Sequence, residues 1–326
     1  PDPVLPAAIP LTEGSWQFAV LPDLQKYNWQ NGSNMAVLHE VIDWLVAQRD
    51  PLQIGFVGTV GDLTAKNLTV HWDRLRPAFA KLDGELPYVL CLGNHDTGAN
   101  GWARERETMP VNDYFDLSDN PRNDPATGGT FRHAFSFDEG GDPCFESTAH
   151  EFIAPDGRKF LLISLEFSPR QAVVDWAAAL CDRPEYQEHI GVLFVHSYLY
   201  ENDTIYKWPE KNDDNGIQFG NPHGTGLAAF DDDVHDGTEL WNELVSQKRQ
   251  FRMVFCGSVS ASDGVGYLMS RNAYGDRVHQ MLFDPEWRYR GGNGFFRMLE
   301  FVAGSNTVQV RSFSPYLEGQ GLFPWI

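Results

Sequence analysis

The 326-residue sequence is poor in cysteine, in positive charge and in long apolar runs. No hydrophobic run approaches the roughly 20 residues of a spanning helix, so we expect no membrane span. Lys and Arg total 25 against 45 for Asp and Glu, which gives a formal net charge of −20. Because nucleic-acid backbones and anionic membranes repel so acidic a chain, we expect no binding to nucleic-acid backbones.

The four cysteines form no CxxC pair and no zinc-ligand spacing. Cys91 and Cys256 lie in apolar, strand-like runs and are predicted to be buried free thiols. Cys144 and Cys181 lie in more polar stretches, where they can either form a disulfide or stay reduced. The chain begins at Pro1, as it would after removal of a secretion signal or after trimming. These features favour a secreted or periplasmic protein.

Several catalytic signatures are also missing. We find no G-x-S-x-G, no P-loop and no GxGxxG between a strand and a helix, which argues against a serine hydrolase, an NTPase and a dinucleotide enzyme. Repeats and low-complexity tracts are absent as well. What remains is a chain with 42% hydrophobic and 13% aromatic residues, enough to build a large core.

Apolar β-rich runs alternate with amphipathic stretches in the first hundred residues, and strands dominate near the end. The predicted strands are Trp16–Leu21, Leu52–Val57, Tyr88–Leu92, Phe160–Leu165, Gly191–Val195, Phe251–Cys256, Val278–Phe283, Phe295–Phe301 and Thr307–Phe313. The predicted helices are Met35–Gln48, Val70–Leu82, Gln171–Leu180 and Thr238–Val245. This pattern indicates an α/β protein. We expect one domain over residues 1–326, with long excursions over the active-site face at about 97–155 and 199–237.

Polar side chains that can bind metals follow four of the predicted strands. In chain order they are Asp23 with Gln25, Asp62, the run Asn94-His95-Asp96, and His196. Ligands of open α/β sheets bind outside the carboxyl ends of the strands, so we expect these residues to meet in one crevice. Carboxylate, amide and imidazole donors together suit Mn, Mg, Zn or Fe.

In this order and setting the motifs resemble those of the calcineurin-like metallophosphoesterase superfamily. Its pattern of D-x-H, G-D, G-N-H-D/E, a lone His after a strand, and G-H-x-H is matched by the following segments: Asp23-Leu24-Gln25, Gly61-Asp62, Gly93-Asn94-His95-Asp96, His196 and Gly257-Ser258-Val259-Ser260. The resemblance covers about residues 16–313. It implies a four-layer α-β-β-α sandwich of two mixed β-sheets flanked by helices.

The resemblance also implies a role for each matching residue. The metal ligands would be Asp23, Gln25, Asp62, Asn94 and His196, with Asp62 bridging two divalent ions. His95, oriented by Asp96, would act on the transition state or protonate the leaving oxygen. A hydroxide bound to the ions would attack a small phosphate mono- or diester.

Two departures weaken the match. Gln25 stands where the first motif has histidine, as in some bacterial members, and Ser258 and Ser260 replace both histidines of the last motif. With one imidazole left, Mg or Ca becomes more plausible beside Mn, Zn and Fe. The strand before Gly257 is intact, so we expect residue 258 still to reach the crevice.

A cationic, aromatic loop is the second feature. Trp287, Arg288, Tyr289 and Arg290 can bind substrate, with an arginine gripping a phosphate or carboxylate and an aromatic ring stacking on a ring. They can equally form an ordinary turn. An alternative function follows from this loop and the serines: a decayed metal site diverted to glycan binding, or to polysaccharide cleavage by a lyase with a Tyr or His base.

Overall fold

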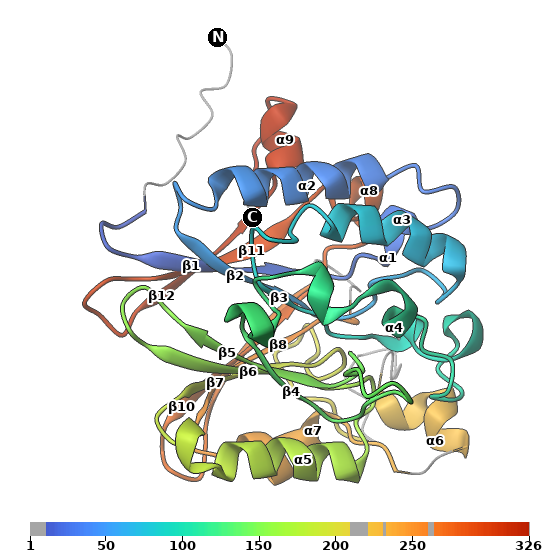
Figure 1. The fold of residues 1–326 in the computed structure, drawn as a ribbon, viewed down its shortest axis with the longest axis vertical. Helices are drawn as coiled ribbons and strands as arrows, with labels where there is room; N and C mark the ends of the chain where they lie inside the picture. Colours follow the sequence, from blue (N-terminus) through green and yellow to red (C-terminus); the bar gives the residue numbers. More distant parts are fainter. Residues whose placement is uncertain (1–10, 209–220, 231–232, 260–263, 326) are drawn as a thin grey trace.

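The computed structural model describes residues 11–208, 221–230, 233–259 and 264–325. Two β-sheets lie face to face, and helices cover the outer side of each sheet (Figure 1). The predicted α/β class and the four-layer α-β-β-α sandwich of two mixed sheets are therefore confirmed.

The first sheet has the strand order β12-β11-β1-β2-β3. Its strands are β1 Trp16–Leu21, β2 Ile54–Thr59, β3 Tyr88–Val89, β11 Phe296–Phe301 and β12 Val308–Phe313. The neighbours β1, β2 and β3 run parallel, whereas β11 and β12 add antiparallel strands at one side.

The second sheet has the strand order β4-β5-β6-β7-β8-β10-β9. Its strands are β4 Phe131–Ala134, β5 Thr148–Ile153, β6 Lys159–Ser164, β7 Ile190–Phe194, β8 Phe251–Cys256, β9 Val265–Arg271 and β10 Arg277–Phe283. The central strands β6, β7, β8 and β10 run parallel, and β4, β5 and β9 are antiparallel to their neighbours. Each sheet thus contains a group of parallel strands whose carboxyl ends carry the candidate site.

Helices α2 and α3 cover the first sheet, and α5 and α7 cover the second (Figure 1). The helices are α1 Gln25–Asn28, α2 Met35–Gln48, α3 Thr69–Phe79, α4 Val111–Tyr114, α5 Gln171–Asp182, α6 Gly226–Phe230, α7 Gly237–Leu240, α8 Tyr289–Gly292 and α9 Pro315–Gly319. After α7 the chain makes a π-helical turn over Trp241–Val245. Among the helices described, none combines the length and apolarity needed to cross a membrane.

Aromatic residues fill the space between the sheets. Trp16 of β1 stacks on Phe301 of β11 with ring centroids 4.2 Å apart, and Phe160 of β6 meets Trp16 edge-on from the other sheet. All three side chains are buried. Large rings of this kind remove much apolar surface from water, so this interior holds the two sheets together and fixes where their strand ends meet.

The structure departs from the predicted elements at the sheet edges. Strands β4 and β5 lie within the 97–155 excursion, and β9 was not predicted. Of the 199–237 excursion, residues 209–220 and 231–232 lie outside the described part. Cys91 and Cys256 are buried free thiols as predicted, and Cys144 and Cys181 are also free, so no disulfide supports the expectation of export.

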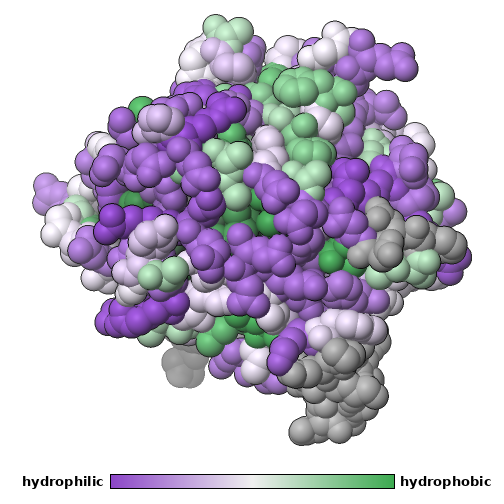
Figure 2. Space-filling view, turned by 90° about the horizontal axis from the view of Figure 1, so that it is seen from below, coloured by the Kyte–Doolittle hydropathy of each residue, from purple (hydrophilic) through white to green (hydrophobic). Residues whose placement is uncertain are grey.

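The surface matches the acidic, polar composition. Figure 2 shows the molecule from below, on the side where α5 and α7 lie, and this face is mostly hydrophilic, with hydrophobic residues gathered in its upper middle part.

Candidate metal centre

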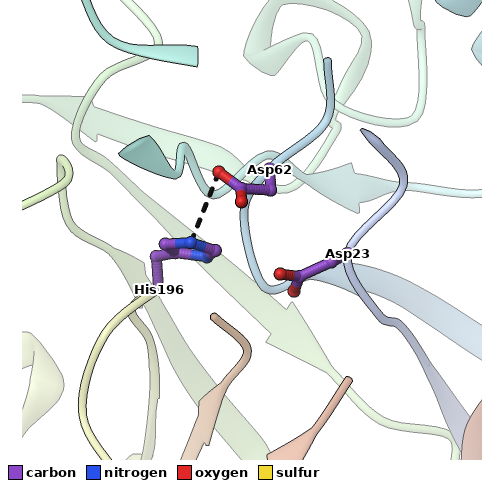
Figure 3. A group of neighbouring side chains, drawn as sticks. All are labelled: Asp23, Asp62 and His196. Atoms are coloured by element: carbon purple, nitrogen blue, oxygen red, sulfur yellow. Dashed lines mark ion pairs between the residues drawn. The ribbon is translucent and has the colours of Figure 1, made fainter. Parts of the chain in front are cut away.

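Asp23, Asp62 and His196 meet between the two sheets, just beyond the ends of β1, β2 and β7 (Figure 3). One ligand atom from each lies within 4.8 Å of the other two, and all three side chains are buried. Parallel neighbours β1 and β2 bring the aspartates together, and the facing sheet contributes the histidine. Side chains predicted to share one crevice do so.

The imidazole of His196 presents one particular nitrogen to the site. Its Nδ1 lies 2.8 Å from the Val60 carbonyl oxygen, which can only accept, so Nδ1 carries a proton. Its Nε2 lies 3.3 Å from Asp62 Oδ1 and 3.2 Å from Asn94 Oδ1. A ring nitrogen held by a backbone carbonyl, with the other directed at carboxylates, is the usual arrangement of a metal-binding histidine.

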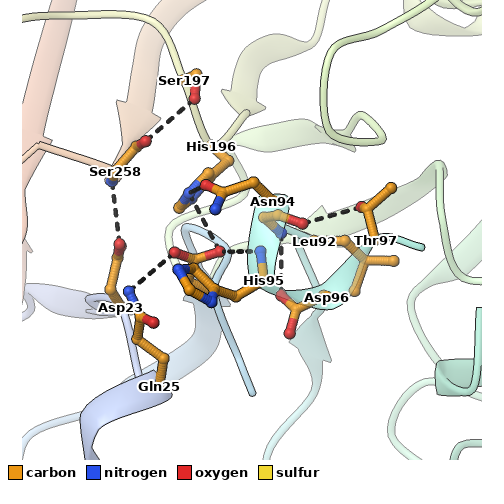
Figure 4. A network of polar contacts seen from close by, with 12 residues as sticks. Asp23, Gln25, Leu92, Asn94, His95, Asp96, Thr97, His196, Ser197 and Ser258 are labelled. Atoms are coloured by element: carbon orange, nitrogen blue, oxygen red, sulfur yellow. Dashed lines mark hydrogen bonds and ion pairs between the residues drawn. The ribbon is translucent and has the colours of Figure 1, made fainter. Parts of the chain in front are cut away.

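Both oxygens of the Asp62 carboxylate have partners within the site (Figure 4). Its Oδ1 accepts from the His95 backbone N–H at 2.9 Å, and its Oδ2 accepts from Gln25 Nε2 at 3.0 Å. Burial alone would raise the pKa of Asp62, but the positive charges of His196 and His95 lower it. The same attraction overcomes the effect of burial on His196 and raises its pKa to about 8.

Asp23 is less well satisfied. Its Oδ2 accepts from the Ser258 backbone N–H at 3.1 Å, but its Oδ1 has no hydrogen-bond partner in the described part of the chain. Burial, followed by the negative charges of Asp284 and Asp62, raises the pKa of Asp23 well above its ordinary value. A bound cation would stabilise a buried carboxylate that has an unpaired oxygen and acidic neighbours.

Glycines allow these loops to approach the carboxylates. A Cβ on Gly93 would lie 2.1 Å from Asp62 Oδ1, and a Cβ on Gly257 would lie 1.9 Å from Asp23 Oδ1. Both distances are far below van der Waals contact. The glycines of the G-N-H-D and G-S-V-S segments are therefore required by close packing against the acidic side chains.

We expected Asp96 to contact the His95 ring, but it does not. Its carboxylate accepts from the backbone N–H groups of Leu63, Thr64 and Gly93 at 2.7 to 3.0 Å, and so ties two loops together. The His95 Nδ1 instead lies 2.7 Å from the Ala65 carbonyl oxygen. The expected orienting role is wrong because backbone donors already engage both oxygens of Asp96.

The last motif reaches the site, but without imidazole. Ser258 is half-buried, its backbone N–H bonds Asp23, and its Oγ accepts from Ser197 Oγ at 3.2 Å. Residue 258 thus lies in the crevice as predicted. Ser260 lies outside the described residues.

Two acidic residues that the sequence reasoning missed lie beside the site. Asp284 and Glu286 follow β10 and are buried, and both act electrostatically on Asp23. The sequence does contain a signal for Asp284, because this residue directly follows an apolar strand and Asp23 follows one closely. It went unnoticed because neither residue belongs to the family motifs.

The four residues of the cationic loop fall into two pairs with different surroundings. Trp287 and Arg288 line a cavity of about 230 Å³ together with Lys26 and Trp29. The Lys26 ammonium lies 3.8 Å from the Trp287 ring centre and 4.0 Å from that of Trp29.

Tyr289 and Arg290 of the same loop are not among the residues that line this cavity. Tyr289 is 70% exposed, and the Arg290 guanidinium lies over the rings of Tyr289 and Tyr316. Only half of the predicted binding loop therefore faces the cavity.

Known proteins resemble the chain only distantly. No family model matches the chain. Uncharacterized protein YvnB of Bacillus subtilis is 20% identical over 320 residues, which are 97% of this chain and 21% of that protein. The chain thus spans about a fifth of the length of this curated relative.

Among solved structures, purple acid phosphatase PPD1 from yellow lupin (Lupinus luteus) seeds matches with a TM-score of 0.52 and 11% identity, over 97% of this chain and 54% of that one. The NAD nucleotidase NadN of Haemophilus influenzae matches with a TM-score of 0.45 and 12% identity, over 93% of this chain and 48% of that one. The likeness to the lupin phosphatase shows a shared fold.

Proposed function

We propose that the protein is a divalent-cation-dependent phosphoesterase that hydrolyses a small phosphate mono- or diester. The observation that carries this proposal is the buried group of Asp23, Asp62 and His196, whose ligand atoms lie within 4.8 Å of one another. A fold shared with a purple acid phosphatase supports it. So does the order of motifs along the chain.

The donor set fits a divalent cation. Asp23 Oδ1 is buried and lacks a hydrogen-bond partner among the described residues, and the His196 Nε2 faces the same space. We assign Asp23, Gln25 and Asp62 to one cation, and Asp62, Asn94 and His196 to a second. Gln25 would bind through its amide oxygen, so its amide must turn over, because its nitrogen now faces Asp62.

Bound cations supply positive charge that stabilises the phosphoryl oxygens and acidifies water. His95 supplies the proton chemistry of the chain itself. The Ala65 carbonyl holds the proton on His95 Nδ1, which leaves Nε2 as the nitrogen that takes up and donates a proton. We propose that protonated His95 gives this proton to the leaving oxygen.

The cavity lined by Lys26, Trp287 and the acidic Glu286 suits the rest of the substrate. Lys26 and Arg288 supply positive charge for an anionic group, and Trp29 and Trp287 supply rings on which a flat group can stack. We propose that the phosphate lies at the carboxylate side of this cavity and that the ester group extends over the tryptophans. Tyr289 and Arg290 are left out of this binding role.

A hydrolysis assay tests the proposal. Metal-stripped protein is supplied in turn with Mg²⁺, Mn²⁺, Zn²⁺ and Ca²⁺ and assayed with p-nitrophenyl phosphate and bis(p-nitrophenyl) phosphate. We expect activity that needs a cation, and a fall in kcat of about 10²–10⁴-fold in His95→Ala, because general acid catalysis contributes that much. The matched control, His39→Ala on the outer helix α2, should keep wild-type activity.

Activity that survives both metal stripping and His95→Ala would refute the proposal. The glycan alternative is tested with the same metal-stripped protein on acidic polysaccharides. Cation-independent appearance of an unsaturated sugar product, without phosphoester hydrolysis, would establish the lyase function in its place.

A further inference from the structure

We propose that Asp284 is a ligand of the first cation and takes the place that the family pattern gives to a histidine of the last motif. The inference rests on the proposed cation site of Asp23 and Asp62. It concerns a residue that no motif assigns, and it changes the chemical character of the site.

The sheet register brings Asp284 to the correct strand end. Strands β10 and β8 are parallel neighbours, with Met281 paired to Phe255 and Leu282 to Cys256. Asp284 directly follows β10 and Ser258 follows β8 by two residues, so both lie at the carboxyl ends of neighbouring parallel strands. The backbone N–H of Ser258 in turn bonds Asp23 Oδ2 at 3.1 Å. Asp284 therefore lies at the same edge of the sheet as the last motif, from which imidazole has been lost.

The Asp284 carboxylate has an oxygen to spare. The residue is fully buried, and its Oδ1 accepts from the Glu286 backbone N–H at 3.2 Å. For its Oδ2, the described segments provide no hydrogen-bond partner. Asp23 Oδ1 is in the same condition. Two buried carboxylate oxygens without partners, one beyond the end of β1 and one beyond the end of β10 in the facing sheet, are suited to share one cation.

The local charge also favours a bound cation. Asp284 and Asp62 are the two strongest negative influences on Asp23, and burial with nearby acids raises the pKa of both Asp23 and Asp284. Lys26 is attracted to the same acids, but its ammonium lies over the rings of Trp29 and Trp287 at the cavity side. Buried carboxylates repel one another unless a cation lies among them.

A first site of Asp23, Asp62, Asp284 and the amide oxygen of Gln25 contains oxygen donors alone. Such a set binds hard cations such as Mg²⁺, Mn²⁺ and Ca²⁺, and it loses the preference for Zn²⁺ that imidazole provides. The serine at position 258 is then compatible with a working site. We expect this first site to prefer Mn²⁺ over Zn²⁺ more strongly than the same site would if two histidines were added.

Calorimetric titration of metal-stripped protein with Mn²⁺ tests the assignment. Asp284→Asn should weaken the affinity by on the order of 100-fold, since even loss of a supporting partner of a ligand costs about 10–100-fold. Asp43→Asn, which removes an exposed acid on α2, should bind like the wild type. Unchanged Mn²⁺ binding in Asp284→Asn would overturn the inference.

Thermal unfolding separates a ligand from a structural residue. Without metal, Asp284→Asn removes a repelled buried charge, so its melting temperature should match or exceed that of the metal-free wild type. The rise in melting temperature that Mn²⁺ gives the wild type should largely vanish. A lower melting temperature without metal, with the Mn²⁺ response intact, would show a structural role and refute the proposal.

A third variant tells failure of this inference apart from failure of the proposed function. Asp62→Asn should abolish Mn²⁺ binding and hydrolysis together. If Asp62→Asn does so but Asp284→Asn binds normally, only the assignment of Asp284 is wrong. If Asp62→Asn binds Mn²⁺ like the wild type, the proposed cation site itself is wrong.

Discussion

The buried carboxylates of the site have two different surroundings. Asp96 is surrounded by backbone N–H donors, whereas Asp23 and Asp284 each have an oxygen without a hydrogen-bond partner in the described chain. A carboxylate whose oxygens are satisfied by the protein stabilises the fold, and one whose oxygens are not is available to a ligand. Residues of one chemical type thus serve structure and binding within a single site.

We predict that Asp96→Asn destabilises the protein by about 2 kcal/mol, because an amide nitrogen cannot accept and leaves buried backbone N–H donors without a partner. Burial, followed by the charge of Asp62, raises the pKa of Asp96 to about 6. The measurement is therefore urea unfolding at pH 8, where the carboxylate is charged. Asp43→Asn is the control, and equal stability of the two variants would contradict the prediction.

We predict that Ser258→His raises the cation affinity of the Asp62, Asn94 and His196 site by on the order of 10–100-fold, since it adds a nitrogen ligand. The backbone of Ser258 has a φ of 73°, a left-handed conformation that histidine adopts more readily than most residues. Titration with Zn²⁺ should show the largest gain. Ser118→His, at an exposed position, serves as control, and identical titrations would show that this side chain does not reach the ions.

At the scale of elements, the strands of the first sheet and the parallel strands of the second could be predicted, whereas the antiparallel strands β4, β5 and β9 could not. Strands β1 and β8 and helix α2 have the predicted bounds, because continuous apolar runs and a clear stripe mark them. Strand β9 went unrecognised because exposed side chains recur along it at the sheet edge, as Tyr267 and Met269 show. The ligands were predicted from polar residues at the ends of four strands that carry family motifs. Asp284 was missed because it follows β10, which carries none of these motifs.

The strand ends tolerate little change in shape. We predict that Gly257→Ala lowers Mn²⁺ affinity at least tenfold, because its Cβ would lie 1.9 Å from Asp23 Oδ1 and the loop must move. Gly140→Ala, in an exposed turn where the nearest atom to an added Cβ belongs to the flexible Asp138 side chain at 3.2 Å, should bind Mn²⁺ normally. Calorimetry of the two variants decides the matter, and wild-type affinity in Gly257→Ala would show that the loop can shift without disturbing the site.

At the scale of the whole molecule, folding without metal buries carboxylates that are already deprotonated in the unfolded chain. Burial and neighbouring acids raise the pKa of Asp23 and Asp284 above 3.8, so the folded protein binds more protons than the unfolded chain. Burial opposes protonation of His196, but Asp62 raises its pKa to about 8 from 6.5. The stability from His196 is complete below pH 6.5 and is lost as the pH rises through 8.

We therefore predict that metal-free protein loses stability between about pH 6.5 and 8.5, and that saturating Mn²⁺ reduces this loss because cations favour the deprotonated ligands. Melting temperatures across this range, with and without Mn²⁺, give the two slopes. A melting temperature of the metal-free protein that rises with pH over this range would contradict the prediction.

Anomalous X-ray diffraction from crystals grown with Mn²⁺ tests the central claim most directly, because it locates the cation without reference to activity. We predict an anomalous peak in contact with Asp62, with Asp23 and Asp284 as further ligands of the ion. A fully occupied peak elsewhere, for instance at the second cluster of His223, Asp236 and Glu239, with none between Asp23 and Asp62, would contradict the account.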